Sequence, residues 1–556
     1  MKALLVTMMA VALGATPITY QIDLARYFRS AGEEARSRST TIADAKAFAS
    51  SGTPSTAAAL LRWLQRYDTL LTNLERHDIY VYLKAEQNDQ DITDAKADDE
   101  LGTTEQLISE RVVEAARRLG AARIHDLRRL PSLVPYRYLL ADSLAQARHR
   151  LSPAEARSVA VAVTPVLNAA ASSYKALRKS SAKIENNQDA YAALLVSIAV
   201  ARNGVARLRG FSGAAPAAYF DRSIDPASVE RTLQAARDSD GYAQYLAVVA
   251  KAPKPAFSPA PIPVSDAIPL VLAATQPMGT AYAGAYAALL NPADQRLEIC
   301  TAPECDDTGF SVGLLGSESG VYFGGYDGTT AKARALSHES GHAVHRQFMA
   351  AHQPIAAYNR GPAFMFESFA IFNELLFLDY LYKNAATGAE RAYYLNYFLH
   401  DATFQVFGSA EETELEGTIY RGVDDGTIKT AADFNALTTK VFARYDPSSV
   451  NDPATKVYWA RNRLFFTDPL YDVNYLYAGL LALDYFTRFE SDSKSFSPRF
   501  VALLKNGFND SPAALERRFL RINLSDEKTL VGNATALIDA RTKMLAELYS
   551  SAATAR

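Results

Sequence analysis

Cysteine and net charge are both scarce in this chain, and each shortage excludes a class of protein. The 556 residues include 2 cysteines, and one cysteine pair without a second pair nearby is a poor candidate for a zinc ribbon. The formal net charge of −3 gives no electrostatic reason to expect nucleic-acid binding. Apolar residues make up 49% and charged residues 21%, which is typical of a globular chain that is neither disordered nor embedded in a membrane.

Long hydrophobic runs are also missing. The apolar run from Ala3 to Ala15 is too short to span a bilayer, so we expect no membrane span. Because a lysine precedes this run and small residues end it, residues 1–15 suit a secretory signal, which predicts a periplasmic or secreted protein. The alternative is a buried N-terminal helix of a cytoplasmic protein. Cys300 and Cys305 are close enough for a small-loop disulfide in an oxidising compartment, although two free thiols also fit.

Length and helical patterning predict more than one lobe. A chain of 556 residues is too long for one core of ordinary size. Helical patterns fill residues 16–250, and a stiff proline-rich segment follows at 251–265. Helical patterning resumes over 266–556, with short strand signals between residues 297 and 323. We therefore expect an N-terminal helical lobe, a linker and a C-terminal helical domain.

The most informative segment of the chain places two histidines and a glutamate on one helical turn. His338 and His342 are four residues apart, so on a helix both imidazoles project from the same face. Neutral imidazoles are good zinc ligands, and Glu339 beside them can take a proton from a water that the metal activates. Four of the 8 histidines lie between His338 and His352, which favours a site over two unrelated surface histidines.

A mononuclear zinc site needs a third protein ligand. The metzincin pattern requires Gly and His three and six residues after the second histidine, but those positions hold His345 and Phe348. Glu367 and Glu374 are seven residues apart, hence on one helical face, within an almost wholly apolar stretch. A buried carboxylate must be paired or bind a metal. We therefore expect Glu367 to be the third ligand and Glu374 to accept a hydrogen bond from a ligand imidazole.

In these residues the chain resembles the thimet oligopeptidase and oligoendopeptidase F family of zinc metallopeptidases. The family pattern is His-Glu-x-Gly-His-x-x-His, with a glutamate ligand about 25 residues downstream and another acidic residue one heptad later, and residues 338–345, 367 and 374 match it. The resemblance implies one Zn²⁺ per chain, with Glu339 as the general base and with three ligands, His338, His342 and Glu367. His345 matches a histidine that is not a ligand in the family, so it either supports a ligand from behind or packs the helix. Ser340 departs from the pattern, because the family usually has Phe or Leu there.

A short strand signal precedes the two histidines. Residues 320–325 read as a strand and a turn, and Thr329 or Thr330 is a suitable N-cap for the following helix. In the family an edge strand here pairs with the substrate backbone. The resemblance therefore implies that Tyr322, Gly324 and Gly325 bind substrate by strand addition; a plain hairpin is the alternative.

A tyrosine-rich segment lies downstream and is similar to a loop of the same family. Tyr471 and Tyr475 are the first candidates for phenols that donate to the developing oxyanion, with Tyr477 next to them as a substrate-binding residue. The family usually has a histidine a few residues before the first of these tyrosines, but no histidine follows His400 in this chain. Either Arg463 or backbone donors replace it, or the stabilisation of the transition state is weaker.

The fold class that we expect is mostly α, with a small β element next to the zinc-binding helix. The resemblance implies two helical lobes flanking a deep channel that admits only unfolded peptides. The function predicted is zinc-dependent endoproteolysis of short peptides by a monomer. A zinc exopeptidase on the same scaffold and a degenerate homologue that binds peptides without cutting them are the alternatives; the intact Glu339 argues against the degenerate homologue.

Overall fold

The computed structural model describes residues 20–87, 92–180, 183–254, 257–301, 308–313 and 315–554. The predicted leader at residues 1–15 and Cys305 of the predicted disulfide lie outside this part of the chain. Within the described part, helices dominate and the strands are three short ones. The predicted class, mostly α with a small β element, is confirmed.

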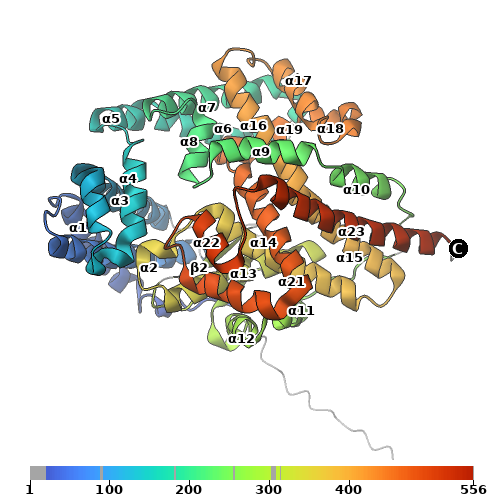
Figure 1. Cartoon of the computed structure of the whole chain (residues 1–556), viewed down its shortest axis with the longest axis horizontal. Coiled ribbons are helices and arrows are strands. Elements are labelled where there is room, and N and C mark those ends of the chain that lie inside the picture. Colours follow the sequence, from blue (N-terminus) through green and yellow to red (C-terminus); the bar gives the residue numbers. More distant parts are fainter. Residues whose placement is uncertain are drawn as a thin grey trace, which may run out of the picture.

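The N-terminal helices, at the blue end of the chain in Figure 1, pack around a smaller hydrophobic core. This core also includes five residues from later in the chain: Val312, Tyr322, Ile355, Ala356 and Tyr358. On α2 the apolar side chains recur at helical spacing and are buried, as Leu60, Leu64, Leu71 and Leu74 show. A stripe of this kind must be covered by neighbouring helices, and α1, α3 and the short helices after it provide the cover. The bounds are α1 (Ala31–Ala49), α2 (Ala57–Gln87), α3 (Ile92–Leu127) and α4 (Arg137–Ala147).

A second and larger hydrophobic core extends from Ala170 to Leu545 and holds most of the remaining helices. In the N-terminal half, the change from the smaller to the larger core thus falls between residues 140 and 170 and not at the proline-rich segment. Part of that segment is instead tied to the turn after the sheet, because the Ile262 backbone N–H donates to Gly328 O at 2.7 Å. The domain boundary at 251–265 stays a prediction. The helices that follow α4 and precede the proline-rich segment are α5 (Pro153–Ala162), α6 (Thr164–Lys179), α7 (Gln188–Leu208), α8 (Ala214–Asp221), α9 (Pro226–Arg237) and α10 (Gly241–Val249).

Helix α7 is long and apolar enough, by length and composition alone, to cross a membrane, and it is the one such helix among the described residues. Its side chains Tyr191, Leu195 and Ile198 are buried in the larger core. A core helix passes the same test of length and composition, so the finding is weak evidence for a membrane span.

The sheet has three strands, β1 (Leu297–Ile299), β2 (Gly309–Val312) and β3 (Gly320–Phe323), in the order β1-β3-β2. Strand β1 runs parallel to β3, with Glu298 opposite Tyr322, and β2 runs antiparallel, with Phe310 opposite Tyr322. Tyr322 is thus on the middle strand of the described sheet, so its predicted place on an edge strand is wrong. The reason is that β1 occupies the second side of β3. The edge strand next to the histidine helix is β2.

The helices that carry the site are α13 (Thr330–His352) and α14 (Ala363–Asn384), and α14 packs between α13 and α21 (Asp472–Asn506). Thr329 caps α13, because its side chain accepts from the Lys332 backbone N–H as predicted. Gly341 allows the close approach of the two helices: a Cβ at this position would lie 2.6 Å from Asn373 Nδ2 of α14. This approach brings the histidine face of α13 onto the side chains of α14.

The other helices of the C-terminal half surround these three and close the larger core. Figure 1 shows α23, the long red helix, lying beside α15. The remaining bounds are α11 (Val264–Thr275), α12 (Thr280–Leu289), α15 (Gly388–Thr403), α16 (Ser409–Asp424), α17 (Ala431–Phe442), α18 (Pro453–Lys456), α19 (Tyr458–Arg461), α20 (Leu464–Thr467), α22 (Pro512–Leu520) and α23 (Glu527–Thr554).

Candidate metal centre

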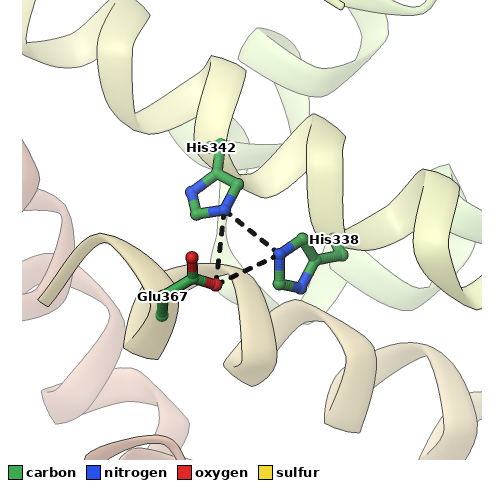
Figure 2. Close-up of side chains that lie close together, drawn as sticks. All are labelled: His338, His342 and Glu367. Carbon is green, nitrogen blue, oxygen red and sulfur yellow. Dashed lines mark hydrogen bonds and ion pairs between the residues drawn. The ribbon is translucent and has the colours of Figure 1, made fainter. Parts of the chain in front are cut away.

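Three side chains from α13 and α14 converge on one point, as Figure 2 shows. His338 Nε2 and His342 Nε2 are 3.1 Å apart. Glu367 Oε2 lies 3.4 Å from His338 Nε2 and 3.8 Å from His342 Nε2. The three side chains are 17%, 14% and 15% exposed, so the point where they meet is shielded but open to solvent on one side. The structure therefore brings together the three residues that the sequence predicts as ligands.

This donor set fits zinc. Two imidazole nitrogens and one carboxylate oxygen, with room for a further ligand, form a usual zinc hydrolase site. Glu367 Oε2 is buried and accepts no hydrogen bond from any described residue, although it faces both imidazoles. An orphaned buried carboxylate oxygen is costly unless a cation occupies the space in front of it. Burial, followed by the neighbouring His338, lowers the pKa of His342 to about 3, so this ring is neutral and one of its nitrogens keeps a lone pair.

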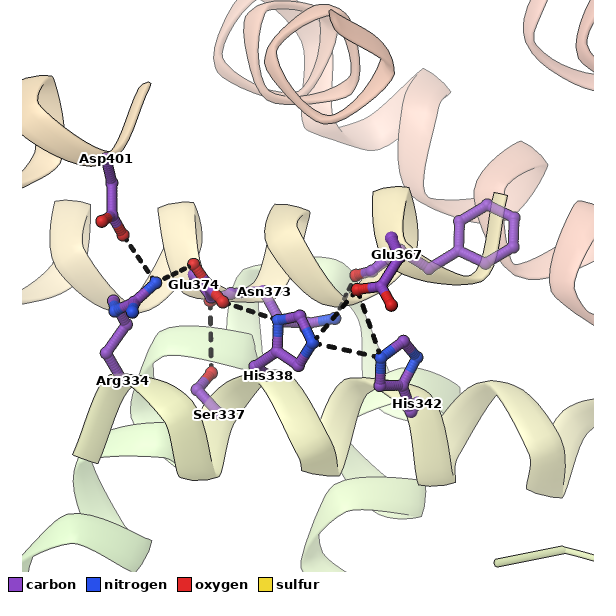
Figure 3. Close-up of polar contacts among 9 residues, drawn as sticks. Arg334, Ser337, His338, His342, Glu367, Asn373, Glu374 and Asp401 are labelled. Carbon is purple, nitrogen blue, oxygen red and sulfur yellow. Dashed lines mark hydrogen bonds and ion pairs between the residues drawn. The ribbon is translucent and has the colours of Figure 1, made fainter. Parts of the chain in front are cut away.

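A chain of charged contacts runs behind His338, as Figure 3 shows. His338 Nδ1 lies 2.6 Å from Glu374 Oε1, and the other oxygen of Glu374 accepts from Arg334 Nη1. The same guanidinium nitrogen donates to Asp401 Oδ2 of α15 at 2.8 Å. Burial opposes the ionisation of Glu374, but Arg334 and His338 outweigh it and lower the pKa of this carboxyl to about 2. The contact predicted for Glu374 is present in the structure, whereas Arg334 and Asp401 are additional.

Glu339 lies next to the three converging side chains, with its own side chain against β2. A Cβ on Gly309 would meet Glu339 Cγ at 2.9 Å, so the strand leaves room for this glutamate only because residue 309 is glycine. Burial, reinforced by Glu367 and Glu374 and opposed by His338 and Arg346, raises the pKa of Glu339 to about 7. A carboxylate with this pKa is a competent proton acceptor near neutral pH.

The two tyrosines that we consider first as oxyanion donors lie on the other side of Glu367. The Tyr471 hydroxyl donates to Glu367 Oε1 at 3.2 Å, and the Tyr475 ring packs edge-on against Tyr471, with ring centres 5.4 Å apart. Burial, then the charge of Glu367, raises the pKa of both phenols, so both are protonated donors. Tyr475 also lines a cavity of about 290 Å³ together with Arg463, the residue considered as a substitute for the family's histidine.

Tyr477 points away from this group. Its ring is buried, and its hydroxyl lies 3.2 Å from Thr232 Oγ1 of α9. Burial raises the pKa of Tyr477, and hydrogen bonds to Thr232 and Ser228 lower it in part. The carboxylates that act on this phenol are Glu527 and Asp225, whereas Glu367 acts on Tyr471 and Tyr475. The structure therefore does not bring Tyr477 to the converging ligands.

His345 is buried among aromatic rings of α14, about one turn after His342 on α13. Its ring centre is 4.8 Å from that of Phe366 and 4.6 Å from that of Phe369. The Nδ1 atom has no hydrogen-bond partner in the described part of the chain, and burial lowers the pKa of the ring, so His345 is neutral. Of the two roles considered from the sequence, these contacts favour helix packing.

The predicted substrate-binding residues of β3 are engaged in the sheet. Tyr322 is 2% exposed and stacks on Phe310, with ring centres 5.0 Å apart. The Gly324 N–H donates to Thr308 O at 2.8 Å, and Gly325 makes the turn with a φ of +65°. Helix α13 contacts both β2 and β3. Backbone pairing with a substrate would have to use an outer strand, and β2 is the outer strand that touches Glu339.

The comparisons with known proteins agree with this geometry. Residues 318–533 match the model of peptidase family M3, and this segment contains α13, α14 and the tyrosines. Over this segment the chain is similar to peptidase family M3. The resemblance stated from the sequence is thereby confirmed.

Curated proteins match this chain over part of its length. The plasmid-borne oligoendopeptidase F of Lactococcus lactis subsp. cremoris is 28% identical over 164 residues, which cover 27% of the chain and 27% of that protein. The group B oligopeptidase PepB of Streptococcus agalactiae serotype III is 26% identical over 210 residues, which cover 35% of the chain and 34% of that protein. The matched part thus spans about a quarter to a third of these relatives.

Solved structures share the fold of this chain over nearly its whole length. A crystal structure of a Chlamydophila abortus protein superposes with a TM-score of 0.78 at 17% identity and covers 95% of this chain and 98% of that one. Oligoendopeptidase-F from Enterococcus faecium superposes with a TM-score of 0.63 at 16% identity and covers 94% of this chain and 100% of that one. At these identities the likeness concerns the fold alone, and it confirms the predicted helical class with lobes flanking a channel.

Proposed function

We propose that the chain is a zinc-dependent endopeptidase that hydrolyses short unfolded peptides. The observation that carries this proposal is the orphaned Glu367 Oε2, which faces both imidazole Nε2 atoms at 3.4 and 3.8 Å while Glu339 lies beside them. Two imidazole nitrogens and a carboxylate oxygen that face one another without a good hydrogen bond to the carboxylate are arranged as a shared cation would require. One zinc ion per chain, bound by His338, His342 and Glu367, would supply a Lewis acid that polarises the scissile carbonyl and acidifies a water.

The protein residues around that position have separate tasks. Glu339 takes the proton of the attacking water on its carboxylate and then hands it to the amine that leaves. Its pKa of about 7 suits both steps, because the group both binds and releases a proton near neutral pH. Tyr471 and Tyr475 donate to the oxygen of the scissile carbonyl as negative charge builds up on it.

The substrate backbone binds to the free edge of β2. Among the described strands β2 is an outer strand that pairs with β3, and its other edge is the one to which an extended peptide would add as a further strand. Gly309, at one end of β2, touches Glu339, so a peptide along this edge passes the proposed base. Strand addition requires an extended chain, which is why we propose unfolded peptides as substrates.

The test compares two variants of the purified full-length protein, one that removes a proposed zinc ligand and one that removes the proposed general base. Glu367→Ala should lose zinc, as measured by mass spectrometry of the metal content. Glu339→Gln should keep zinc but lose cleavage of an internally quenched peptide, because only the base is removed. Glu100→Gln, on an exposed carboxylate of α3, is the control and should change neither. Cleavage at the normal rate by Glu339→Gln would contradict the role of the base.

The choice of substrate ends separates endopeptidase from exopeptidase action. The quenched peptide is acetylated at its N-terminus and amidated at its C-terminus, so that only an endopeptidase cuts it. Cleavage of the free-ended peptide alone would identify an exopeptidase, and binding without cleavage of either would identify a degenerate homologue. A stable folded domain offered in parallel should stay intact, whereas its rapid cleavage would contradict the proposed preference for unfolded chains.

A further inference from the structure

Behind the proposed zinc site, four side chains from three helices form one line of charged contacts, drawn in Figure 3. Asp401 of α15 contacts Arg334 of α13, Arg334 contacts Glu374 of α14, and Glu374 contacts His338 of α13. We propose that Arg334 is a positioning residue for zinc: it fixes Glu374, which in turn holds His338 in the orientation that binds the metal, and Asp401 fixes Arg334. This inference rests on the proposed zinc site.

Glu374 can hold the imidazole only if it is itself held. Its side chain is 5% exposed, so an unpaired carboxylate there would carry a large desolvation cost. One oxygen faces His338 Nδ1 at 2.6 Å and the other accepts from Arg334, so both oxygens are engaged and the carboxylate cannot rotate freely. When Nδ1–H donates to the carboxylate, Nε2 is left with a lone pair that points at Glu367 and His342.

Arg334 and the two histidines lie along one face of α13. Positions 334, 338 and 342 are each four residues apart, so the guanidinium is carried by the same rigid helix as the rings that it supports. Its Nη1 atom serves two carboxylates, because it donates to Glu374 and, at 2.8 Å, to Asp401. Asp401 is 15% exposed and lies on α15, so the arginine is also held from a third helix.

A purely structural role is the competing explanation, because the same contacts tie α13, α14 and α15 together. The chain offers a matched control for it. Arg541 of α23 is 5% exposed and bridges Asp379 of α14, at 2.9 Å, and Glu490 of α21, at 2.6 Å. This arginine ties three helices together through the same helix α14, but it contacts none of the proposed ligands. Arg541→Met should therefore lower stability without changing zinc affinity.

The measurement is the zinc dissociation constant of the metal-depleted full-length protein, obtained by competition with a chromophoric chelator. Arg334→Met should weaken zinc binding by roughly 10- to 100-fold, as expected when the support of a ligand histidine is removed. Arg334→Lys keeps one charged donor toward Glu374 and should restore part of the affinity. Asp401→Asn should cause a smaller loss of the same sign. Arg541→Met should leave the constant within about twofold of the parent value, even if its Tm falls further than that of Arg334→Met.

A double-mutant cycle tests the path of the effect. If Arg334 acts through Glu374, then Arg334→Met should add little to the loss already caused by Glu374→Gln. Full additivity would overturn the proposed path, and so would a folded Arg334→Met protein that binds zinc as tightly as its parent. If Arg334→Met does not fold, Arg334→Lys and Asp401→Asn carry the same test. A parent protein that binds no zinc would instead refute the proposed function, so the two failures can be told apart.

Discussion

Replacing Tyr471 by phenylalanine tests two roles of one hydroxyl group, namely the contact with Glu367 in the structure and the proposed donation to the oxyanion. From the sequence, this phenol is expected to act only on the transition state and to leave the metal untouched. In the structure it donates to Glu367 Oε1 at 3.2 Å, while the other oxygen of Glu367 faces the two imidazoles. Tyr471→Phe should therefore affect zinc affinity as well as turnover. Tyr475→Phe is the matched variant, because the Tyr475 ring packs on Tyr471 and does not replace its contact with the carboxylate.

The size of the effect on zinc follows from the hydrogen bond that is lost. A hydrogen bond to a charged group contributes about 1.5–3 kcal/mol, which corresponds to roughly a 10- to 100-fold change in affinity. The bond from Tyr471 is 3.2 Å long, slightly beyond the usual O–H···O range of about 2.5–3.0 Å, so we expect a loss of no more than about tenfold. Removing an oxyanion donor lowers turnover by roughly 10²–10³. Tyr471→Phe should show both losses and Tyr475→Phe only the second.

The assay measures both quantities on each variant. Zinc affinity is obtained by competition with a chelator, and turnover is measured at saturating zinc and peptide so that lost metal does not imitate lost chemistry. An unchanged zinc constant for Tyr471→Phe would refute the idea that its hydroxyl supports Glu367. Near-full turnover of both variants would show that neither phenol is the oxyanion donor, and Arg463 would be the next residue to replace.

Three further outcomes follow from the same structure. Gly309→Ala should lower turnover at least tenfold with zinc retained, because its Cβ would meet Glu339 Cγ at 2.9 Å, whereas Gly388→Ala, with nothing within 4 Å, is the silent control. Stripping zinc with a chelator should lower Tm and abolish cleavage, and added zinc should restore both, since a ligand bound only to the folded state stabilises it by mass action. Burial, opposed by a hydrogen bond from Tyr485, raises the pKa of Glu516 to about 8. The contribution of Glu516 to the free energy of unfolding is therefore complete below about pH 4.5 and is lost as the pH rises to about 8. Glu516→Gln should therefore raise the denaturation midpoint more at pH 8 than at pH 5; equal shifts at both pH values would contradict the burial of a protonated carboxyl.

The ligand set could be predicted from the sequence because it depends mainly on local geometry. A spacing of four residues fixes two rings on one helical face wherever the helix lies, and a carboxylate in an apolar helix demands a partner. Both rules apply to His338, His342 and Glu367 without knowledge of the tertiary fold, and the structure brings the three side chains together. The contact between Glu374 and His338 follows from the heptad spacing in the same way.

The sheet could not be predicted to the same degree, because strand order depends on residues far apart in the chain. Nothing local to Tyr322 reveals that Leu297–Ile299 pairs with one side of its strand and Gly309–Val312 with the other. Once β1 occupies one side, the free edge passes to β2. The position along the chain where the hydrophobic cores change could not be predicted either. A proline-rich segment resembles a linker in sequence even where, as at Ile262, its backbone is hydrogen-bonded to the rest of the structure.

The residues that the sequence did not reveal share a physical property: their role depends on a contact made across helices or strands. Arg334 has a local signal, since it lies four residues before His338 on the same face, but an arginine at that spacing is equally common on a solvated helix face. Arg334 is half-buried and bridges two carboxylates only because Glu374 and Asp401 contact it from two other helices. Gly309 has still less signal, because a glycine in a short strand indicates a turn as readily as a close approach. Glu339 thus depends on the absence of a side chain at Gly309 of β2. His338 depends on Arg334 of its own helix through Glu374. Neither dependence can be inferred before the packing of the helices and the sheet is known.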